Sequence, residues 1–393
     1  MGNNYILFFD EIDKKDVALV GGKGANLGEM TKAGFQVPYG FCVTTEAYRD
    51  FLQYNKLLDF ITEVIKDANL KNISQVGKKI REKIEKSEIP EAVAFEILSA
   101  VHKIGAANYF AVRSSATAED LAFASFAGQQ DTYLNINGDN SVLLSVRDCW
   151  SSLFTDRAIL YRIQNKIEHK NVYISAVVQK MVLPKVAGIM FTADPLSGHR
   201  DIISIDASYG LGEALVSGIV SPDIYKIRKS SLQIDSKIIG NKKFAIMPIQ
   251  GGGTKKVDIT DKKSKSQVME DSKIKKLAQL GIEIEKHYGC PQDIEWCEEK
   301  DELYIVQSRP ITSLFPLPAP LPQDNALHAY VSFNHMEVMI DPISPLGIDI
   351  LRTIFSLDSG AKSEEEYKFL TCAAGRIYID LSELLQFKII RKK

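Results

Sequence analysis

The spacing of apolar residues along the first hundred positions changes from a strand-like run to a helical repeat. Residues 5–9 (YILFF) predict a strand, and residues 23–32, which follow a Gly-Gly pair, predict a helix. From 45 to 104 apolar side chains recur three and four positions apart, as at Leu58 and Ile61. This stretch therefore predicts a block of helices.

Residues that favour strands dominate the middle of the chain. Residues 109–136 predict a strand, a long polar loop and a second strand, and 172–238 predict mostly antiparallel sheet because short β-rich runs alternate with turns. A helix is predicted at about 267–288, and two strands, 292–297 and 303–309, are joined by the acidic turn EEKDE. The whole pattern indicates an α+β fold.

A proline-rich segment, LFPLPAPLPQ at 314–323, predicts a stiff extended linker. We expect a first domain at 1–313, the linker at 314–325, and the incomplete start of a second domain at 326–393. A division of this kind also fits the length of 393 residues, because single hydrophobic cores stop growing near ~250–300 residues.

Composition narrows the class of protein. Hydrophobic residues make up 45% and charged residues 25%, and no apolar run reaches the ~18 residues of a membrane span, so we expect a soluble globular protein without a membrane partner. The net charge of −2 and the scattered basic residues argue against nucleic acid as a partner. The five cysteines form no C-x-x-C pair, which favours a reducing cytoplasm and excludes an obvious zinc site.

The first polar cluster is GGKGANLGEM, residues 21–30. Gly21, Gly22 and Gly24 would let the backbone approach a ligand at a helix N-terminus, and Lys23 could add a positive charge for a phosphate. A glycine-rich helix cap with a solvent-exposed lysine explains the same residues.

The second cluster spans 111–135 (AVRSSATAEDLAFASFAGQQDTYLN). Arg113 ends a predicted strand, and hydroxyl and small residues follow it as far as Gly128. A guanidinium group can bind the oxygens of a triphosphate, and a loop of small residues can fold over it. The alternative is a surface loop that binds nothing.

The third cluster lies on the predicted hairpin of PQDIEWC and YIVQSRP. Asp293 and Glu295 are two positions apart and so point to one face of a strand. If the EEKDE turn closes symmetrically, Asp293 lies opposite Gln307, and Arg309 follows on the same face. Two carboxylates and an amide suit Mg²⁺ bound together with nucleotide phosphates. A solvent-facing, salt-bridged hairpin is the alternative.

Two further segments carry weaker signals. VVQKMV at 177–182 predicts an apolar strand interrupted by two polar residues. Its backbone could bind the edge of an adenine base, or the segment could be a strand of the core. In IDASYGLGEALVSG, Gly210 and Gly212 precede Glu213, which could contact a ribose or a metal, or else begin a capped helix. The glycine triplet 251–253 is better explained as a flexible turn than as a phosphate loop, because no helix opens behind it.

These segments, in this order, resemble the nucleotide-binding domain of the pyruvate phosphate dikinase and phosphoenolpyruvate synthase family, which has an ATP-grasp fold. Several of them look most similar to the rifamycin phosphotransferase branch. The segments that carry the resemblance are GGKGANLGEM, VPYGFCVTT, FAVRSSATAEDLAFASFAGQQDTYLN, CWSSLFTDRA, VVQKMV, GIMFTADP, DASYGLGEALVSG, DIEW and YIVQSRPIT.

The resemblance implies a role for each candidate residue. It implies ATP and Mg²⁺ as cofactors, with the catalytic and phosphate-binding groups on Lys23, Arg113 and Arg309. The remaining implied contacts are the phosphate loop at Gly128, the adenine hinge at Gln179, Lys180, Met181 and Val182, the nucleotide contact of Glu213, the metal ligands Asp293, Glu295 and Gln307, and the phosphate contact of Gln307.

The reaction of the family passes the β-phosphoryl group of ATP to a histidine on a mobile domain, and then to pyruvate or, in the rifamycin branch, to an antibiotic hydroxyl. AMP and phosphate are released. None of the six histidines here has the T-S-H-A-like neighbours of that acceptor. We therefore expect a fragment that lacks the histidine domain, although 330–347 and 373–385 resemble the opening of the rifamycin-binding domain. A phosphoenolpyruvate synthase and a non-catalytic nucleotide-binding module remain alternatives.

Overall fold

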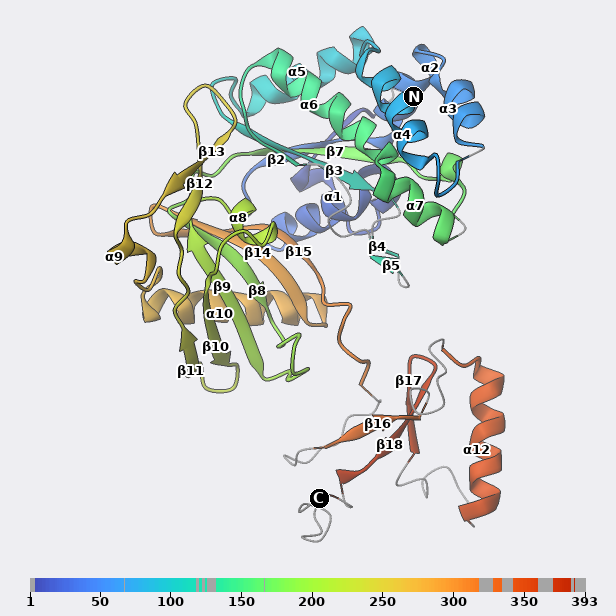
Figure 1. The fold of residues 1–393 in the computed structure, drawn as a ribbon, viewed down its shortest axis with the longest axis vertical. Coiled ribbons are helices and arrows are strands. Elements are labelled where there is room, and N and C mark those ends of the chain that lie inside the picture. Colours follow the sequence, from blue (N-terminus) through green and yellow to red (C-terminus); the bar gives the residue numbers. More distant parts are fainter. Residues whose placement is uncertain are drawn as a thin grey trace. The chain divides into compact units, whose positions relative to one another are not determined.

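The structure is a computed structural model in which the chain forms two compact units, Met1–Thr312 and Ser313–Lys393. Figure 1 shows the fold of both units. The described residues are 4–66, 68–117, 120–121, 124–125, 132–165, 167–317, 328–333, 342–359, 370–382 and 385.

The first unit contains a five-stranded sheet in which every neighbouring pair is antiparallel. It confirms the predicted strand at 5–9 and the strand, loop and strand at 109–136. Most of the loop lies outside the described residues, apart from the short pair β4 (Asp120–Leu121) and β5 (Ala124–Ser125). In spatial order the strands are β1 (Ile6–Phe8), β2 (Gly40–Val43), β7 (Ile174–Lys180), β3 (Phe110–Ala116) and β6 (Thr132–Ile136).

Helices cover one face of this sheet (Figure 1), and they confirm the helical block predicted at 45–104. Alternate residues of β7 separate the two sides: Val178 packs into the core beneath the helices, whereas Val177 packs into the core on the other side. The covering helices are α2 (Thr45–Tyr54), α3 (Leu57–Ile65), α4 (Ile73–Glu85), α5 (Glu91–Ile104), α6 (Asp139–Ser151) and α7 (Asp156–Gln164), with short 3-10 turns at Phe9–Glu11, Ser152–Phe154 and His169–Asn171.

The opposite face of the sheet contacts α1 (Val17–Lys32). The helix begins at Val17 rather than at the predicted residue 23, and Gly21 interrupts it with φ 69° and ψ 176°. That backbone conformation is open to glycine alone, because a Cβ would be strained there. The Gly-Gly pair therefore divides one helix rather than preceding it.

A second, six-stranded sheet completes the first unit, and α10 (Asp271–Tyr288) packs on one of its faces. Its neighbouring strands are antiparallel, as predicted for 172–238, but that segment is shared between the two sheets because β7 belongs to the first. In spatial order the strands are β11 (Ile234–Ile238), β10 (Asp223–Arg228), β9 (Ile202–Tyr209), β8 (Val186–Phe191), β14 (Gln292–Glu299) and β15 (Glu302–Pro310).

A separate hairpin of β12 (Phe244–Pro248) and β13 (Thr254–Asp258) was not predicted from the sequence. The glycine triplet 251–253 forms its turn, in agreement with the prediction of a turn there. The turn docks on Asn135 of β6: the Gly253 amide donates to Asn135 O at 3.0 Å, and Asn135 Nδ2 donates to Ile249 O and Gly253 O at 2.7 Å each. Two short helices, α8 (Glu213–Val216) and α9 (Asp261–Ser264), lie near this hairpin in sequence.

The second unit has a three-stranded antiparallel sheet with the order β16 (Tyr330–Ser332), β18 (Arg376–Asp380) and β17 (Leu370–Ala373), together with α12 (Pro345–Ser359). Positions 318–327, which include most of the predicted linker, lie outside the described residues. None of the helices in the described part of the chain combines the length and apolar character that a membrane crossing needs.

Candidate functional site

Four polar side chains share one face of the β14–β15 hairpin. The strand register pairs Asp293 with Arg309 and Glu295 with Gln307. The prediction that Asp293 lies opposite Gln307 is therefore wrong, although the prediction that these four residues lie on one face is confirmed.

A two-residue turn and a bulge together set this register. Lys300 and Asp301 form the turn with φ values of 52° and 68°, which is typical of a tight hairpin turn. The register that the turn begins would place Ser308 opposite Asp293. It shifts between Glu295 and Trp296, where β15 carries one extra residue, and this bulge returns the polar residues of both strands to the same face.

Arg309 and Asp293 form a close ion pair on this face. Arg309 Nε donates to Asp293 Oδ2 at 2.9 Å, and Nη2 lies 2.9 Å from the same oxygen. The Asp293 side chain is only 14% exposed, so the hairpin face is not the solvent-facing surface of the alternative explanation. Burial raises the pKa of Asp293, against the lowering effect of Arg309, and the nearby Glu295 raises it further. This carboxylate would therefore gain from a further cation.

Arg113 joins the first sheet to this hairpin. From β3 its Nη1 donates to Val306 O at 2.9 Å and its Nη2 donates to Glu295 Oε2 at 2.9 Å. The two side chains of the ion pair are 13% and 24% exposed. Residues far apart in sequence are thus brought together at the hairpin, with both carboxylates already paired with arginines.

Lys23 lies beside the same strand as Arg113. Its Nζ donates to Ser114 O at 3.1 Å, and the next residue, Gly24, donates its amide to Ser115 Oγ at 3.2 Å. A Cβ on Gly21 would stand 2.3 Å from Ser115 O. Gly21 is therefore needed for the close approach of α1 to β3, and Lys23 is held half-buried rather than fully exposed.

The predicted adenine hinge follows β7. Gln179 is 2% exposed and donates from Nε2 to Pro38 O at 3.2 Å. The amides of Lys180 and Met181 donate to Tyr39 O and Tyr109 O, at 2.8 Å each. Two hinge amides are therefore already bonded, and the hinge amide that donates to no described residue is that of Val182.

Glu213 begins α8 near the hinge rather than near the carboxylates. Its Oε2 accepts a hydrogen bond from Thr254 Oγ1 of β13 at 3.3 Å. Residues on either side of it, Leu211 and Ala214, form a small apolar cluster against which Met181 packs. The structure thus brings the hinge and α8 together. Gly128 lies outside the described residues.

Sequence reasoning missed a second row of polar residues on the same face of the six-stranded sheet. The register carries Glu295 across to Ile189 and then to Asp206 on β9. Burial raises the pKa of Asp206, and Lys226 opposes the shift. The signal was present in the sequence, because DIISIDAS places polar residues at every second position of the strand.

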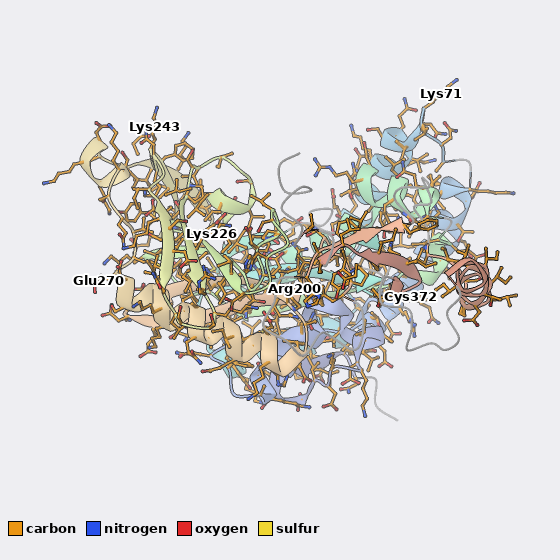
Figure 2. All side chains as sticks on the ribbon, turned by 90° about the horizontal axis from the view of Figure 1, so that it is seen from below. Lys71, Arg200, Lys226, Lys243, Glu270 and Cys372 are labelled. Carbon is orange, nitrogen blue, oxygen red and sulfur yellow. The ribbon has the colours of Figure 1, made fainter. Side chains whose placement is uncertain are left out.

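Lys226, labelled in Figure 2, continues this face on β10. Its Nζ donates to Asp194 Oδ1 at 2.9 Å and to Ser204 Oγ at 3.0 Å. The face therefore carries ionisable side chains on β10, β9, β14 and β15, whereas the opposite face of the sheet is apolar beneath α10.

A hard divalent cation fits the donor set of the hairpin only in part. Among the described residues no group of three or more His, Cys, Asp and Glu side chains is placed to hold a metal. Asp293, Glu295 and Gln307 offer two carboxylates and one amide oxygen on adjacent strands. That set matches Mg²⁺ sites in which one or two carboxylates are completed by phosphate and water oxygens.

Comparison with known proteins gives one family and two groups of relatives. Residues 17–317 match the family described as "Pyruvate phosphate dikinase, AMP/ATP-binding domain". The chain is 45% identical over 387 residues to a rifampicin phosphotransferase of Bacillus subtilis (strain 168), covering 98% of this chain and 43% of the relative. It is 47% identical over 318 residues to a probable phosphoenolpyruvate synthase of Methanocaldococcus jannaschii, covering 79% of this chain and 27% of the relative. The chain thus spans less than half the length of these relatives.

Proposed function

Because the chain belongs to the family of the pyruvate phosphate dikinase AMP/ATP-binding domain, we propose that it is the ATP- and Mg²⁺-binding part of a phosphotransferase. The observation that carries the proposal is the contact of Arg113 with Glu295 and Val306, which assembles cations and carboxylates from both sheets at one place. Sites that transfer phosphoryl groups act mainly by positioning and by charge stabilisation, and need such an assembly.

In this proposal the phosphates of ATP bind to three cationic side chains. Lys23 lies on α1, Arg113 lies on β3, and Arg309 lies on β15 of the hairpin that Arg113 contacts. When a phosphate arrives, each guanidinium exchanges a carboxylate for a phosphate oxygen, with which it forms the same forked contact. The loop that contains Gly128 covers the phosphates in this proposal.

In this proposal the adenine base, at the end of ATP opposite the phosphates, lies against residues Gln179 to Val182. The Val182 amide is the donor for the base edge, because the amides of Lys180 and Met181 are already bonded within the protein. Glu213, exposed on the short helix beside this hinge, accepts hydrogen bonds from the ribose.

Asp293, Glu295 and Gln307 hold Mg²⁺ in this proposal. The metal, when bound, neutralises phosphate charge and orients the phosphoryl group. The protein residues hold the hairpin face rigid, and Arg113 and Arg309 keep the two carboxylates paired until nucleotide and metal arrive together.

The acceptor of the β-phosphoryl group is a histidine on a further domain, and a rifamycin hydroxyl receives the phosphate from it, with release of AMP and phosphate. The rifamycin acceptor is favoured because the relatives named rifampicin phosphotransferase match 97–98% of the chain, including the second unit. The probable phosphoenolpyruvate synthases match 79–80% of it.

Thermal unfolding of the full chain tests the binding step. ATP with Mg²⁺ at about 100 times the Kd should stabilise the chain by about 2.7 kcal/mol. The matched variant Glu295→Gln, which keeps the shape and loses the charge, should lose most of the Mg²⁺-dependent part. Absence of any shift at millimolar nucleotide would sink the proposal.

A pyruvate-specific enzyme is the second candidate, favoured by the 47% identity to a probable phosphoenolpyruvate synthase. The histidine and acceptor domains of each relative can be supplied in trans, with rifampicin or pyruvate offered in turn. Consumption of pyruvate alone would assign the chain to this candidate. Nucleotide binding without AMP formation in either mixture would identify a non-catalytic module.

A further inference from the structure

The guanidinium of Arg162 is buried in the helical block with no counter-charge among the described residues. Arg162 lies on α7 and is 1% exposed. Its Nε donates to His169 Nδ1 at 2.8 Å, whereas Nη1 and Nη2 are buried and have no hydrogen-bond partner. Buried charges in proteins are normally paired, so two unpartnered guanidinium nitrogens need an explanation.

The neighbouring titratable groups do not neutralise this charge. Burial lowers the pKa of Arg162 only to about 10, so the guanidinium stays charged at neutral pH. Burial and the Arg162 charge lower the pKa of His169 to about 4, so the imidazole is neutral. Burial raises the pKa of the Tyr48 phenol, which is also neutral. The charge of Arg162 is therefore uncompensated by the described part of the chain.

The surroundings supply donors and aromatic rings. The Phe154 ring centroid lies 5.7 Å from Arg162 Cζ. The buried indole nitrogen of Trp150 also lacks a partner, and its ring packs at 5.9 Å from that of Tyr48, which senses the charge of Arg162. A ligand bound at the two Nη groups of Arg162 must therefore accept hydrogen bonds.

We infer that the two Nη groups of Arg162 bind a small monovalent anion of halide size within the helical block. The guanidinium of Arg162 carries one positive charge, and its Nη1 and Nη2 atoms can both donate to one anion that carries a single negative charge. Phosphate or sulfate would bring more charge and more acceptor oxygens than these donors satisfy. A water molecule would bring no charge to compensate that of the buried guanidinium.

The inferred site is separate from the nucleotide site in both residues and role. It lies between α7 and His169, and α7 also packs on α4. Filling it stabilises the helices that cover the first sheet. The inference does not depend on the proposed function, and a protein that binds no ATP would still bind the anion.

Crystals of the full chain grown in sodium bromide test the position of the ion. An anomalous bromine peak within hydrogen-bonding distance of Arg162 Nη1 or Nη2 is expected. An ordered water there, or a carboxylate of the chain paired with Arg162, would overturn the inference.

Melting temperatures test the binding in solution. Replacing gluconate by chloride at constant ionic strength should raise the melting temperature by about 2–4 °C and should saturate. Arg162→Met should abolish the chloride effect, and Arg157→Met, an exposed position on the same helix, should keep it. If Arg162→Met does not fold, Arg162→Lys should weaken halide affinity at least tenfold because it loses the fork. A chloride effect that is absent from the wild-type chain, or unchanged in Arg162→Lys, would contradict the inference.

Discussion

The ion pair between Arg113 and Glu295 holds the two sheets together at the candidate site, and its strength can be measured with a double-mutant cycle. The single changes are Arg113→Met, which keeps much of the aliphatic stem, and Glu295→Gln, which keeps the shape of the side chain. The double variant removes both charges. The cycle isolates the coupling between the two residues from their other contacts.

The structure sets the expected magnitude of the coupling. Two unit charges about 4 Å apart attract by about 4 kcal/mol at an effective dielectric constant of ~20, before the cost of removing them from water. Because the side chains of Arg113 and Glu295 are 13% and 24% exposed, desolvation and screening offset part of this attraction, and we expect a net coupling of about 2 kcal/mol.

The single variants differ because Arg113 has a second contact. Arg113→Met also leaves the carbonyl of Val306 without its donor, and we expect a loss of about 3–4 kcal/mol in the free energy of unfolding. Glu295→Gln should cost about 2 kcal/mol, and the double variant no more than Arg113→Met alone, because no unpaired carboxylate then remains.

Chemical unfolding followed by tryptophan fluorescence provides the assay. Trp150 and Trp296 are the two tryptophans of the chain, and each lies in a different core cluster, so both parts of the first unit report their unfolding. Circular dichroism should give the same midpoints if the transition is two-state. A coupling below about 0.5 kcal/mol would refute the reasoning, because the ion pair would then not hold the sheets together.

Three further changes test other parts of the structure. Asp293→Asn should leave the ligand-free chain as stable or more stable at neutral pH and should remove Mg²⁺-dependent stabilisation by ATP. Because the pKa of Asp293 is raised in the folded chain, its ionisation lowers the stability of the wild-type chain as pH rises from the ordinary aspartate pKa to the raised one. A wild-type chain that lost no stability over this pH range relative to the variant would contradict the assignment. Gly21→Ala should cost at least about 2–3 kcal/mol in urea unfolding, because a Cβ meets Ser115 O at 2.3 Å and the backbone there has φ 69° and ψ 176°; a cost near zero would show that α1 can move away from β3. Lys242→Met should cost about 3–5 kcal/mol, because it leaves Asp223 charged and fully buried, and Asp223→Asn added to Lys242→Met should recover part of the loss in the same assay.

The face shared by the polar residues of the hairpin could be predicted from the sequence, because side chains two apart on a strand point the same way whatever the register. The register itself could not. The two-residue turn at Lys300 and Asp301 shifts the register by one position from the symmetric expectation, and the extra residue on β15 shifts it by one more, so the partner of Asp293 is Arg309 rather than the expected Gln307. The partners of these carboxylates are therefore knowable only from the structure.

Non-local contacts explain the other differences. Gly21 and Gly24 suggested a site for a ligand, and the structure shows that the missing side chain of Gly21 lets α1 approach Ser115 of β3, whereas that of Gly24 makes room for Cys42 of β2. Asp206 was missed because its importance depends on which strand lies beside β9, and sheet order is not written in local periodicity. The helical block, by contrast, was predicted well because its apolar repeat is local.

The docking of the glycine turn on Asn135 connects the first sheet to the segments around Glu213. Three hydrogen bonds connect this residue of the first sheet to the turn of the β12–β13 hairpin, which belongs to the other half of the first unit. The turn is followed by Thr254, whose hydroxyl donates to Glu213, so Asn135 of the first sheet anchors the hairpin that positions this carboxylate.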